Sequence, residues 1–153
     1  MLSRGIKAYG AMPLFAGSSR SELKLLSELT TRLMLPAGTV FARRGQRPRC
    51  EFVIVLDGTA EARRDDRLVE QIGTGSHFGE IGLIRGIREP ATVIASADIT
   101  VDVVAAREFR ALYSLLDVFR LRVTHELDRR IASWITAGSP VGAAPMLVGR
   151  AAP

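Results

Sequence analysis

The sequence predicts a mainly β domain, an antiparallel sandwich or barrel, with helices on either side of it. Short β-rich runs fill residues 39–105 and are separated by turn residues such as Asp57-Gly58 and Asp65-Asp66. Strands that are short and evenly spaced are typical of antiparallel sandwiches and barrels. Before and after this region, apolar residues recur with the period of a helix instead.

The first helix is predicted from about residue 19 to residue 31. Ser19 and Glu22 have the spacing of a capping box, in which each side chain bonds the other residue's backbone N–H. Pro36 and Gly38 end this part of the chain. The apolar residues at helical intervals are Leu23, Leu26, Leu29 and Leu33.

The central region contains the predicted strands and one short helical turn. A turn at Gly75-Ser76 leads into Phe78, and the apolar run from Ile81 to Ile84 is long enough for one turn of helix. The strands are expected at 39–42, 51–56, 59–63, 68–72, 91–95 and 99–104.

Two helices are predicted after the strands, at Arg107–Ser114 and Leu116–Trp134. The second has an apolar face that would pack on the core of the domain or form a homodimer. Residues 137–153 consist mostly of Ala, Gly and Pro, so we expect a flexible tail after a domain at 1–136. The apolar face comprises Leu116, Phe119, Val123, Leu127 and Ile131.

Composition excludes several classes of protein. The 153 residues suffice for one domain, and 47% hydrophobic with 24% charged residues is an ordinary globular composition. The net charge of +5 comes from scattered arginines without interleaved aromatic residues, which disfavours a nucleic-acid surface. The longest apolar run, Phe52–Leu56, is too short to span a membrane. With Cys50 as the only cysteine and no apparent signal peptide, we expect a cytoplasmic protein.

The segment from residue 75 to residue 93 carries the strongest functional signal. It combines Gly79 and the fixed acid Glu80 with nearby arginines and the backbone amides of a helix start. An acid can accept a sugar hydroxyl, while amides and a guanidinium hold a phosphate. The segment therefore suits a small anionic ligand that carries hydroxyl groups.

The order of elements and glycines resembles the cyclic nucleotide-binding domain family over roughly residues 12–134. The resemblance rests on Phe78-Gly79-Glu80, on Asp57-Gly58 after a strand, and on further glycines such as Gly38, Gly45, Gly73 and Gly75. It implies a double-stranded β-helix, a jelly-roll-like barrel of about eight antiparallel strands. One N-terminal helix and two C-terminal helices would flank this barrel.

The resemblance also assigns roles to residues. Glu80 would accept the ribose 2′-hydroxyl, and Gly79, Ile81 and Gly82 would present amides to the cyclic phosphate. Gly82 stands where the family often has alanine, a change without consequence if only the amide matters. Thr92 would offer a hydroxyl near the phosphate or base. Trp134 is a candidate lid over the base, and the apolar lining would be Val53, Val69, Ile72 and Val93.

The sequence departs from the family at the phosphate-binding arginine, which usually follows the glutamate by nine residues. That position holds Glu89, while Arg88 is one step early and Pro90 lacks an N–H. Either the loop shifts so that Arg88 or Arg85 supplies the guanidinium, or the site has lost ordinary cyclic-nucleotide binding.

We interpret the chain as a non-enzymatic sensor of a cyclic nucleotide, cAMP rather than cGMP, that signals through its C-terminal helices to an effector protein or a fused domain. The alternative is a scaffold or interaction domain that binds no nucleotide. The histidines, His77 and His125, are expected at the surface and show no metal-ligand spacing. The residues after Trp134 do not suit a helix-turn-helix, so direct DNA binding is not expected.

Overall fold

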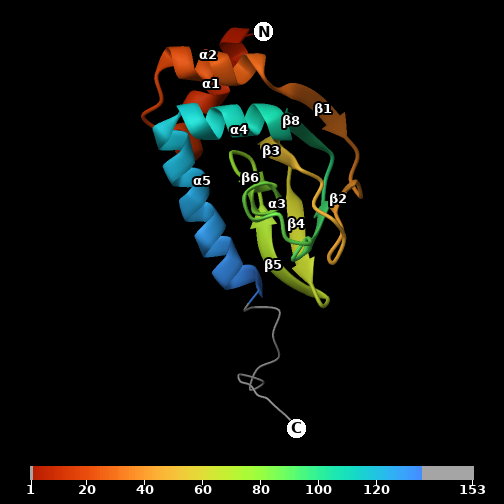
Figure 1. Ribbon diagram of the computed structural model, residues 1–153. Helices are drawn as coiled ribbons and strands as arrows, with labels where there is room; N and C mark the ends of the chain where they lie inside the picture. Colours follow the sequence, from red (N-terminus) through yellow and green to blue (C-terminus); the bar gives the residue numbers. More distant parts are fainter. Residues whose placement is uncertain (1, 136–153) are drawn as a thin grey trace.

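The computed structural model describes residues 2–135, in which three helical segments precede eight strands, one short helix lies between the sixth and seventh strands, and further helices follow the last strand (Figure 1). The N-terminal elements are α1 (Leu2–Gly10), η1 (Pro13–Phe15) and α2 (Arg20–Glu28). The strands are β1 (Thr31–Leu35), β2 (Val40–Ala42), β3 (Glu51–Asp57), β4 (Ala60–Arg64), β5 (Arg67–Ile72), β6 (His77–Phe78), β7 (Thr92–Ala95) and β8 (Ile99–Ala105). The remaining helices are α3 (Glu80–Arg85), α4 (Ala106–Leu115), α5 (Asp117–Arg130) and the π-helical turn η2 (Ile131–Ile135).

The strands form two four-stranded sheets, ordered β1-β8-β3-β6 and β2-β7-β4-β5, in which every pair is antiparallel. The predicted fold class of about eight antiparallel strands with flanking helices is confirmed. The sheets remain two separate ladders and do not close into a continuous barrel.

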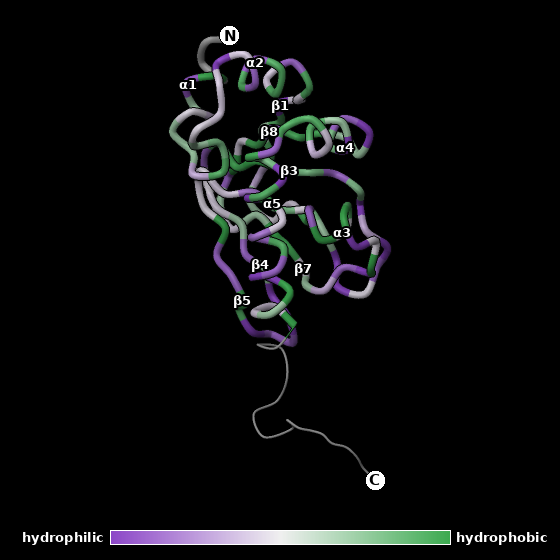
Figure 2. The backbone as a smooth tube through the Cα atoms, turned by 60° about the vertical axis from the view of Figure 1, so that its left-hand side comes forward, coloured by the Kyte–Doolittle hydropathy of each residue, from purple (hydrophilic) through white to green (hydrophobic). Residues whose placement is uncertain are grey.

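Strand β3 divides the core because both of its faces are buried. Phe52 and Ile54 pack among the helices, whereas Val53 and Val55 point between the two sheets. A strand that is buried on both faces has an uninterrupted apolar sequence, as residues 52–56 have. The outer hairpin of β4 and β5 instead mixes hydrophilic and hydrophobic residues (Figure 2).

The first predicted helix was too long at its end. The helix α2 stops at Glu28, and Leu33, which follows the predicted helix at helical spacing, lies on strand β1 with 40% of its surface exposed. The capping box of Ser19 and Glu22 is present as predicted. Strand β1 was missed because it pairs with β8 along one edge only and is almost entirely exposed, so it has no burial alternation.

The C-terminal helix extends as predicted, and its apolar face packs on the chain's own core. Residues Leu116, Phe119, Val123 and Leu127 are all buried. Among the described residues, no helix is both long and apolar enough to cross a membrane. The predicted flexible tail at 137–153 lies outside the described residues.

Two glycines fix where α3 begins. Gly79 has φ 102°, and a Cβ there would lie 2.0 Å from the carbonyl oxygen of Glu51 on β3. At Gly82 a Cβ would lie 2.6 Å from the Cβ of Pro48, so an alanine would have consequences beyond its amide, contrary to expectation. Gly79 therefore allows the start of α3 to approach β3 closely, and Gly82 allows α3 to approach the loop at Pro48.

The substitution Gly79→Ala should abolish folding or cost several kcal/mol of unfolding free energy, because it adds a backbone collision to a left-handed conformation. Gly38→Ala is the matched control, since Gly38 has φ 91° with nothing within 4 Å of an added Cβ. Gly38→Ala should lower the free energy of unfolding only by the strain of the left-handed backbone, roughly 1–3 kcal/mol. Urea unfolding of both variants checks this, and equal losses would contradict it.

Candidate functional site

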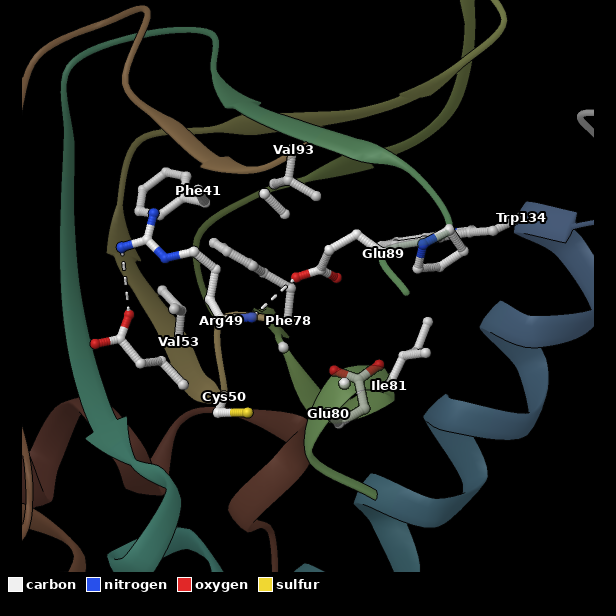
Figure 3. Close-up of a pocket in the computed structure, with 15 residues that line it drawn as sticks. Phe41, Arg49, Cys50, Val53, Phe78, Glu80, Ile81, Glu89, Val93 and Trp134 are labelled. Carbon is white, nitrogen blue, oxygen red and sulfur yellow. Dashed lines mark hydrogen bonds and ion pairs between the residues drawn. The ribbon is translucent and has the colours of Figure 1, made fainter. Parts of the chain in front are cut away.

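A small pocket lies where β3, β6 and α3 meet the loop before β7 and the end of the C-terminal helix (Figure 3). The space open to the centre of a water molecule is about 40 Å³, so the pocket is nearly filled by its own side chains. Its residues are Phe41, Ala42, Arg49, Cys50, Glu51, Val53, Phe78, Gly79, Glu80, Ile81, Gly82, Glu89, Pro90, Val93 and Trp134.

Most of the residues assigned from the sequence meet at this pocket. Gly79 to Gly82 enter it from the start of α3, where no side chain caps the helix. The first amides of a helix have no acceptor within that helix, so these N–H groups are available to a ligand. Val53, Val93 and Trp134 line the pocket as well.

Glu80 occupies the first position of α3 and is completely buried. Its carboxylate accepts two hydrogen bonds from Nη1 of Arg130 on α5, at 3.0 Å to Oε1 and 2.9 Å to Oε2. Arg130 itself is 1% exposed. The acid expected to receive a sugar hydroxyl is thus paired with the C-terminal helix.

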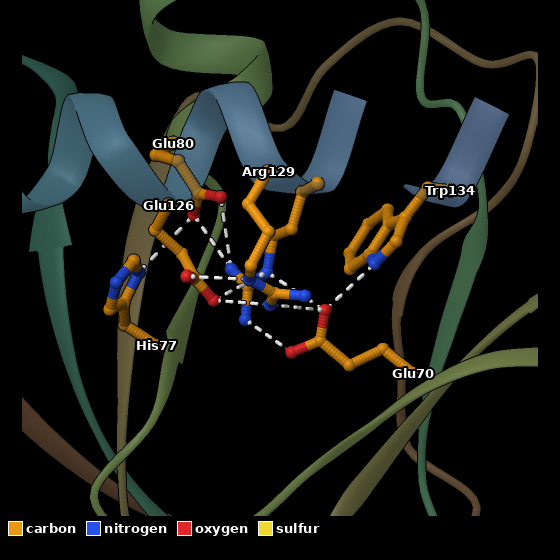
Figure 4. A network of polar contacts seen from close by, with 7 residues as sticks. Glu70, His77, Glu80, Glu126, Arg129 and Trp134 are labelled. Atoms are coloured by element: carbon orange, nitrogen blue, oxygen red, sulfur yellow. Dashed lines mark hydrogen bonds and ion pairs between the residues drawn. The ribbon is translucent and has the colours of Figure 1, made fainter. Parts of the chain in front are cut away.

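Arg130 is the centre of a group of charged residues that we call the Arg130 cluster. Its members are the acids Glu70, Glu80 and Glu126 and the arginines Arg129 and Arg130 (Figure 4). Nε and Nη2 of Arg130 donate to the two oxygens of Glu70 on β5, at 3.1 Å and 2.9 Å. The guanidinium carbon also lies 5.3 Å from the centre of the Trp134 ring. The Trp134 indole N–H donates to Glu70 Oε1 at 2.8 Å.

The cluster keeps its acids ionised. Burial opposes ionisation of Glu80, but the charge of Arg130 and the neighbouring His77 outweigh it and lower the pKa to about 2. For Glu70, burial also opposes ionisation, and the hydrogen bonds and charge of Arg130 lower its pKa. The buried guanidinium is therefore balanced by carboxylates rather than left as an isolated charge.

His77 is buried and not at the surface as predicted. It lies on β6, is 6% exposed, and its Nδ1 is 3.3 Å from Oε1 of Glu80. Its ring also packs against Phe52, with the ring centres 5.0 Å apart. The sequence placed it beside a turn, but strand pairing with Ile54 draws it into the core.

Glu89 also points into the pocket (Figure 3). Its carboxylate accepts one hydrogen bond, a long contact of 3.4 Å from the backbone N–H of Arg49. Burial raises its pKa, and the charge of Glu80 raises it further, against the influence of Arg49. Unlike Glu80, this acid therefore has a carboxylate that is only weakly satisfied.

The other residues that the sequence assigned to ligand binding do not line the pocket. Arg88 is exposed and donates to the carbonyl oxygen of Gly45 at 3.0 Å. Arg85 approaches Asp128 on α5 at 3.5 Å. Thr92 Oγ1 accepts from the backbone N–H of Arg44 at 3.0 Å. Val69 and Ile72 belong to β5 and are also absent from the lining.

Sequence reasoning missed Arg130, Glu70 and Glu126, although one signal was present. On the predicted helix, Arg130 follows the buried Leu127 by three residues and precedes Trp134 by four, so it falls on the buried face. A charged residue on a buried stripe requires partners. Glu126 precedes Arg130 by one helical turn, but Glu70 on β5 and Glu80 on α3 are distant in the sequence, so the sequence alone did not identify them as partners. Among residues 2–135 no group of side chains suits a metal ion.

Comparisons with known proteins identify the family of this domain. The family model of the cyclic nucleotide-binding domain matches residues 32–115. A cyclic nucleotide-gated potassium channel of Rhizobium etli is 33% identical over 112 residues, which cover 72% of this chain and 31% of the channel. The chain spans less than a third of the length of the curated relatives that it matches.

Solved structures share the fold at low identity. The regulatory domain of Toxoplasma gondii protein kinase A with cAMP has a TM-score of 0.72 and 22% identity, over 86% of this chain and 49% of that chain. The regulatory subunit of a cAMP-independent protein kinase A from Trypanosoma cruzi, bound to guanosine, has a TM-score of 0.70 and 20% identity, over 86% and 46%.

Arg130→Met should lower the free energy of unfolding by roughly 3–5 kcal/mol, because it leaves the buried carboxylate of Glu80 without its cation. Arg129→Met is the matched control, since Arg129 contacts Glu70 and Glu126 but is 46% exposed. It should cost less than about 1 kcal/mol. Denaturant unfolding measures the loss of unfolding free energy in both variants. Similar losses would show that the buried pair of Arg130 and Glu80 stabilises the protein no more than the exposed contacts of Arg129 do.

Acid should weaken the cluster. The folded-state pKa of Glu80, about 2, lies below its usual 4.5. Its contribution, roughly 3 kcal/mol, is therefore complete above about pH 4.5 and is lost as the pH falls toward 2. The difference in unfolding free energy between the unaltered protein and Glu80→Gln should shrink across this range. A difference that stays constant with pH would refute the assignment.

Proposed function

The chain belongs to the cyclic nucleotide-binding domain family, and we propose that it is a regulatory module in which a ribose-bearing purine ligand competes with the C-terminal helix for Glu80. The observation that carries this proposal is the buried contact between Glu80 and Arg130. The same carboxylate serves two purposes, since it holds the helix in place and is the acid that the family resemblance assigns to the ribose.

Competition follows from the burial of Glu80. The carboxylate is 0% exposed, and Trp134, which lines the same pocket, is 4% exposed. With only about 40 Å³ open, a nucleoside does not fit until side chains move. The end of α5 with η2 is the element whose displacement both opens the pocket and frees Glu80.

Such competition would transmit the binding of a ligand to the end of the C-terminal helix. A ligand shifts a conformational equilibrium only by its difference in affinity for the two states. Here the ligand favours the state in which Arg130 has left Glu80, so the segment from Arg130 to Trp134 changes position or order on binding. An effector protein or a fused domain that contacts this segment would read the change.

The ligand class is inferred from the family and the pocket. Among cyclic nucleotides we expect cAMP to bind better than cGMP, because neither Glu89 nor Pro90 offers the hydroxyl that guanine-selective relatives often carry. Solved relatives include one with cAMP and one bound to guanosine. We also infer a cytoplasmic location from the single cysteine, Cys50. The rival function, a scaffold without a ligand, predicts no binding at all.

Fluorescence of Trp134, the one tryptophan in the chain, provides the test. Titration with cAMP, cGMP, adenosine and guanosine should change the emission for at least one ligand, because its indole leaves Glu70. Glu70→Gln should tighten that binding by roughly threefold to tenfold, since it weakens the competing helix. Glu80→Gln should weaken it.

The matched control is Glu61→Gln on the neighbouring strand β4, whose carboxylate pairs with Arg63 at 2.9 Å. It should leave the affinity unchanged. No response to any of the four ligands, in the unaltered protein and in Glu70→Gln, would favour the scaffold function. Equal tightening in Glu70→Gln and Glu61→Gln would reject the competition.

A further inference from the structure

Glu89 gives the pocket an uncompensated negative charge. Three acids line it, of which Glu80 is neutralised by Arg130 at 2.9 Å and Glu51 lies 3.7 Å from Arg49. Within residues 2–135 no cationic side chain forms an ion pair with Glu89, and its one hydrogen bond comes from a backbone N–H at 3.4 Å. The pocket therefore presents a half-buried carboxylate where a phosphate-binding site would present a guanidinium.

The nearby guanidinium groups are used elsewhere. Arg49 lines the pocket but extends toward Glu51, at 3.7 Å, with 59% of its side chain exposed (Figure 3). Arg88 donates to the carbonyl oxygen of Gly45, and Arg64 to that of Pro90, both at 3.0 Å. None of these contacts neutralises Glu89.

The backbone fixes Glu89, and not Arg88, at the pocket. The N–H of Gly45 donates to the carbonyl oxygen of Glu89, and the N–H of Glu89 donates to that of Gln46, both at 2.9 Å. Pro90 further restricts Glu89 to extended conformations. A shift of the loop by one residue would break both hydrogen bonds in order to bring Arg88 inward, so the register opposes the shift.

A carboxylate at this place discriminates between ligands by charge. An ionised carboxylate only accepts hydrogen bonds, so it pairs with a hydroxyl or N–H and repels a phosphate in a partly desolvated site. Proton uptake by Glu89 would be needed before a cyclic phosphate could lie against it. A ligand without phosphate has no such requirement, and its 5′-hydroxyl is a donor.

We propose that Glu89 makes this pocket selective for an uncharged purine ribonucleoside over a cyclic nucleotide. The inference rests on the proposed function, since it concerns the same pocket. The ribose hydroxyls would reach Glu80 once Arg130 withdraws, the 5′-hydroxyl would donate to Glu89, and the base would stack on Trp134. Glu89 is then the residue that determines specificity in the pocket.

Isothermal titration calorimetry with adenosine, guanosine and cAMP tests this selectivity on the full chain. The unaltered protein should bind one nucleoside about a hundredfold more tightly than cAMP, as expected for a like-charge contact in a partly buried site. Glu89→Gln should reduce that ratio by at least about tenfold, because the amide is neutral. Glu89→Arg should reverse the preference.

Glu28→Gln is the matched control, since Glu28 is exposed on α2 and its loss changes the net charge equally. It should leave the ratio unchanged. The inference is overturned if the unaltered protein prefers cAMP, or if Glu89→Gln and Glu28→Gln give the same ratio. Binding of cAMP by Glu89→Arg, with no nucleoside binding by the unaltered protein, overturns the selectivity but leaves the family's sensor function. No binding of any ligand to any variant rejects both.

Discussion

The buried guanidinium of Arg130 is the interaction on which the rest of the structure depends. An unpaired charge in a protein interior is costly, so Arg130 is stable there only because Glu70, Glu80 and Glu126 surround it. These acids come from a strand, from the helix at the pocket, and from α5 itself. One side chain thereby joins the sheet that contains β5, the pocket at α3 and the C-terminal helix.

This arrangement connects the pocket to the end of the C-terminal helix. Trp134 shares Glu70 with Arg130 and lines the pocket, so the indole and the guanidinium depend on the same acid. The π-helical turn at 131–135 is the local distortion that accompanies this packing, and such turns are frequent at functional sites. Glu89 contributes separately, because it sets the charge that a ligand meets and not the position of the helix.

The sequence predicted local features well where a pattern repeats or where backbone geometry demands a residue type. The capping box at Ser19, the buried run in β3 and the glycine at 79 are of this kind. Strand β1 was missed because an exposed edge strand has no alternating burial, and His77 was placed at the surface because strand pairing was not visible. The acid at position 89 was recognised as a departure, but only the register with Gly45 and Gln46 shows which residue enters the pocket.

The Arg130 cluster could not be derived from the sequence because Glu70 and Glu80 reach Arg130 by tertiary contacts across 60 and 50 residues. The most direct test of its role is nuclear magnetic resonance of the Arg130 Nη1–H, which donates to Glu80, and of the Trp134 Nε1–H during titration with adenosine, guanosine and cAMP. If ligand and helix compete for Glu80, both protons lose protection from exchange with water together, as the amides of Ile81 and Gly82 respond to the ligand. Full protection of the Arg130 proton at ligand saturation would contradict the account.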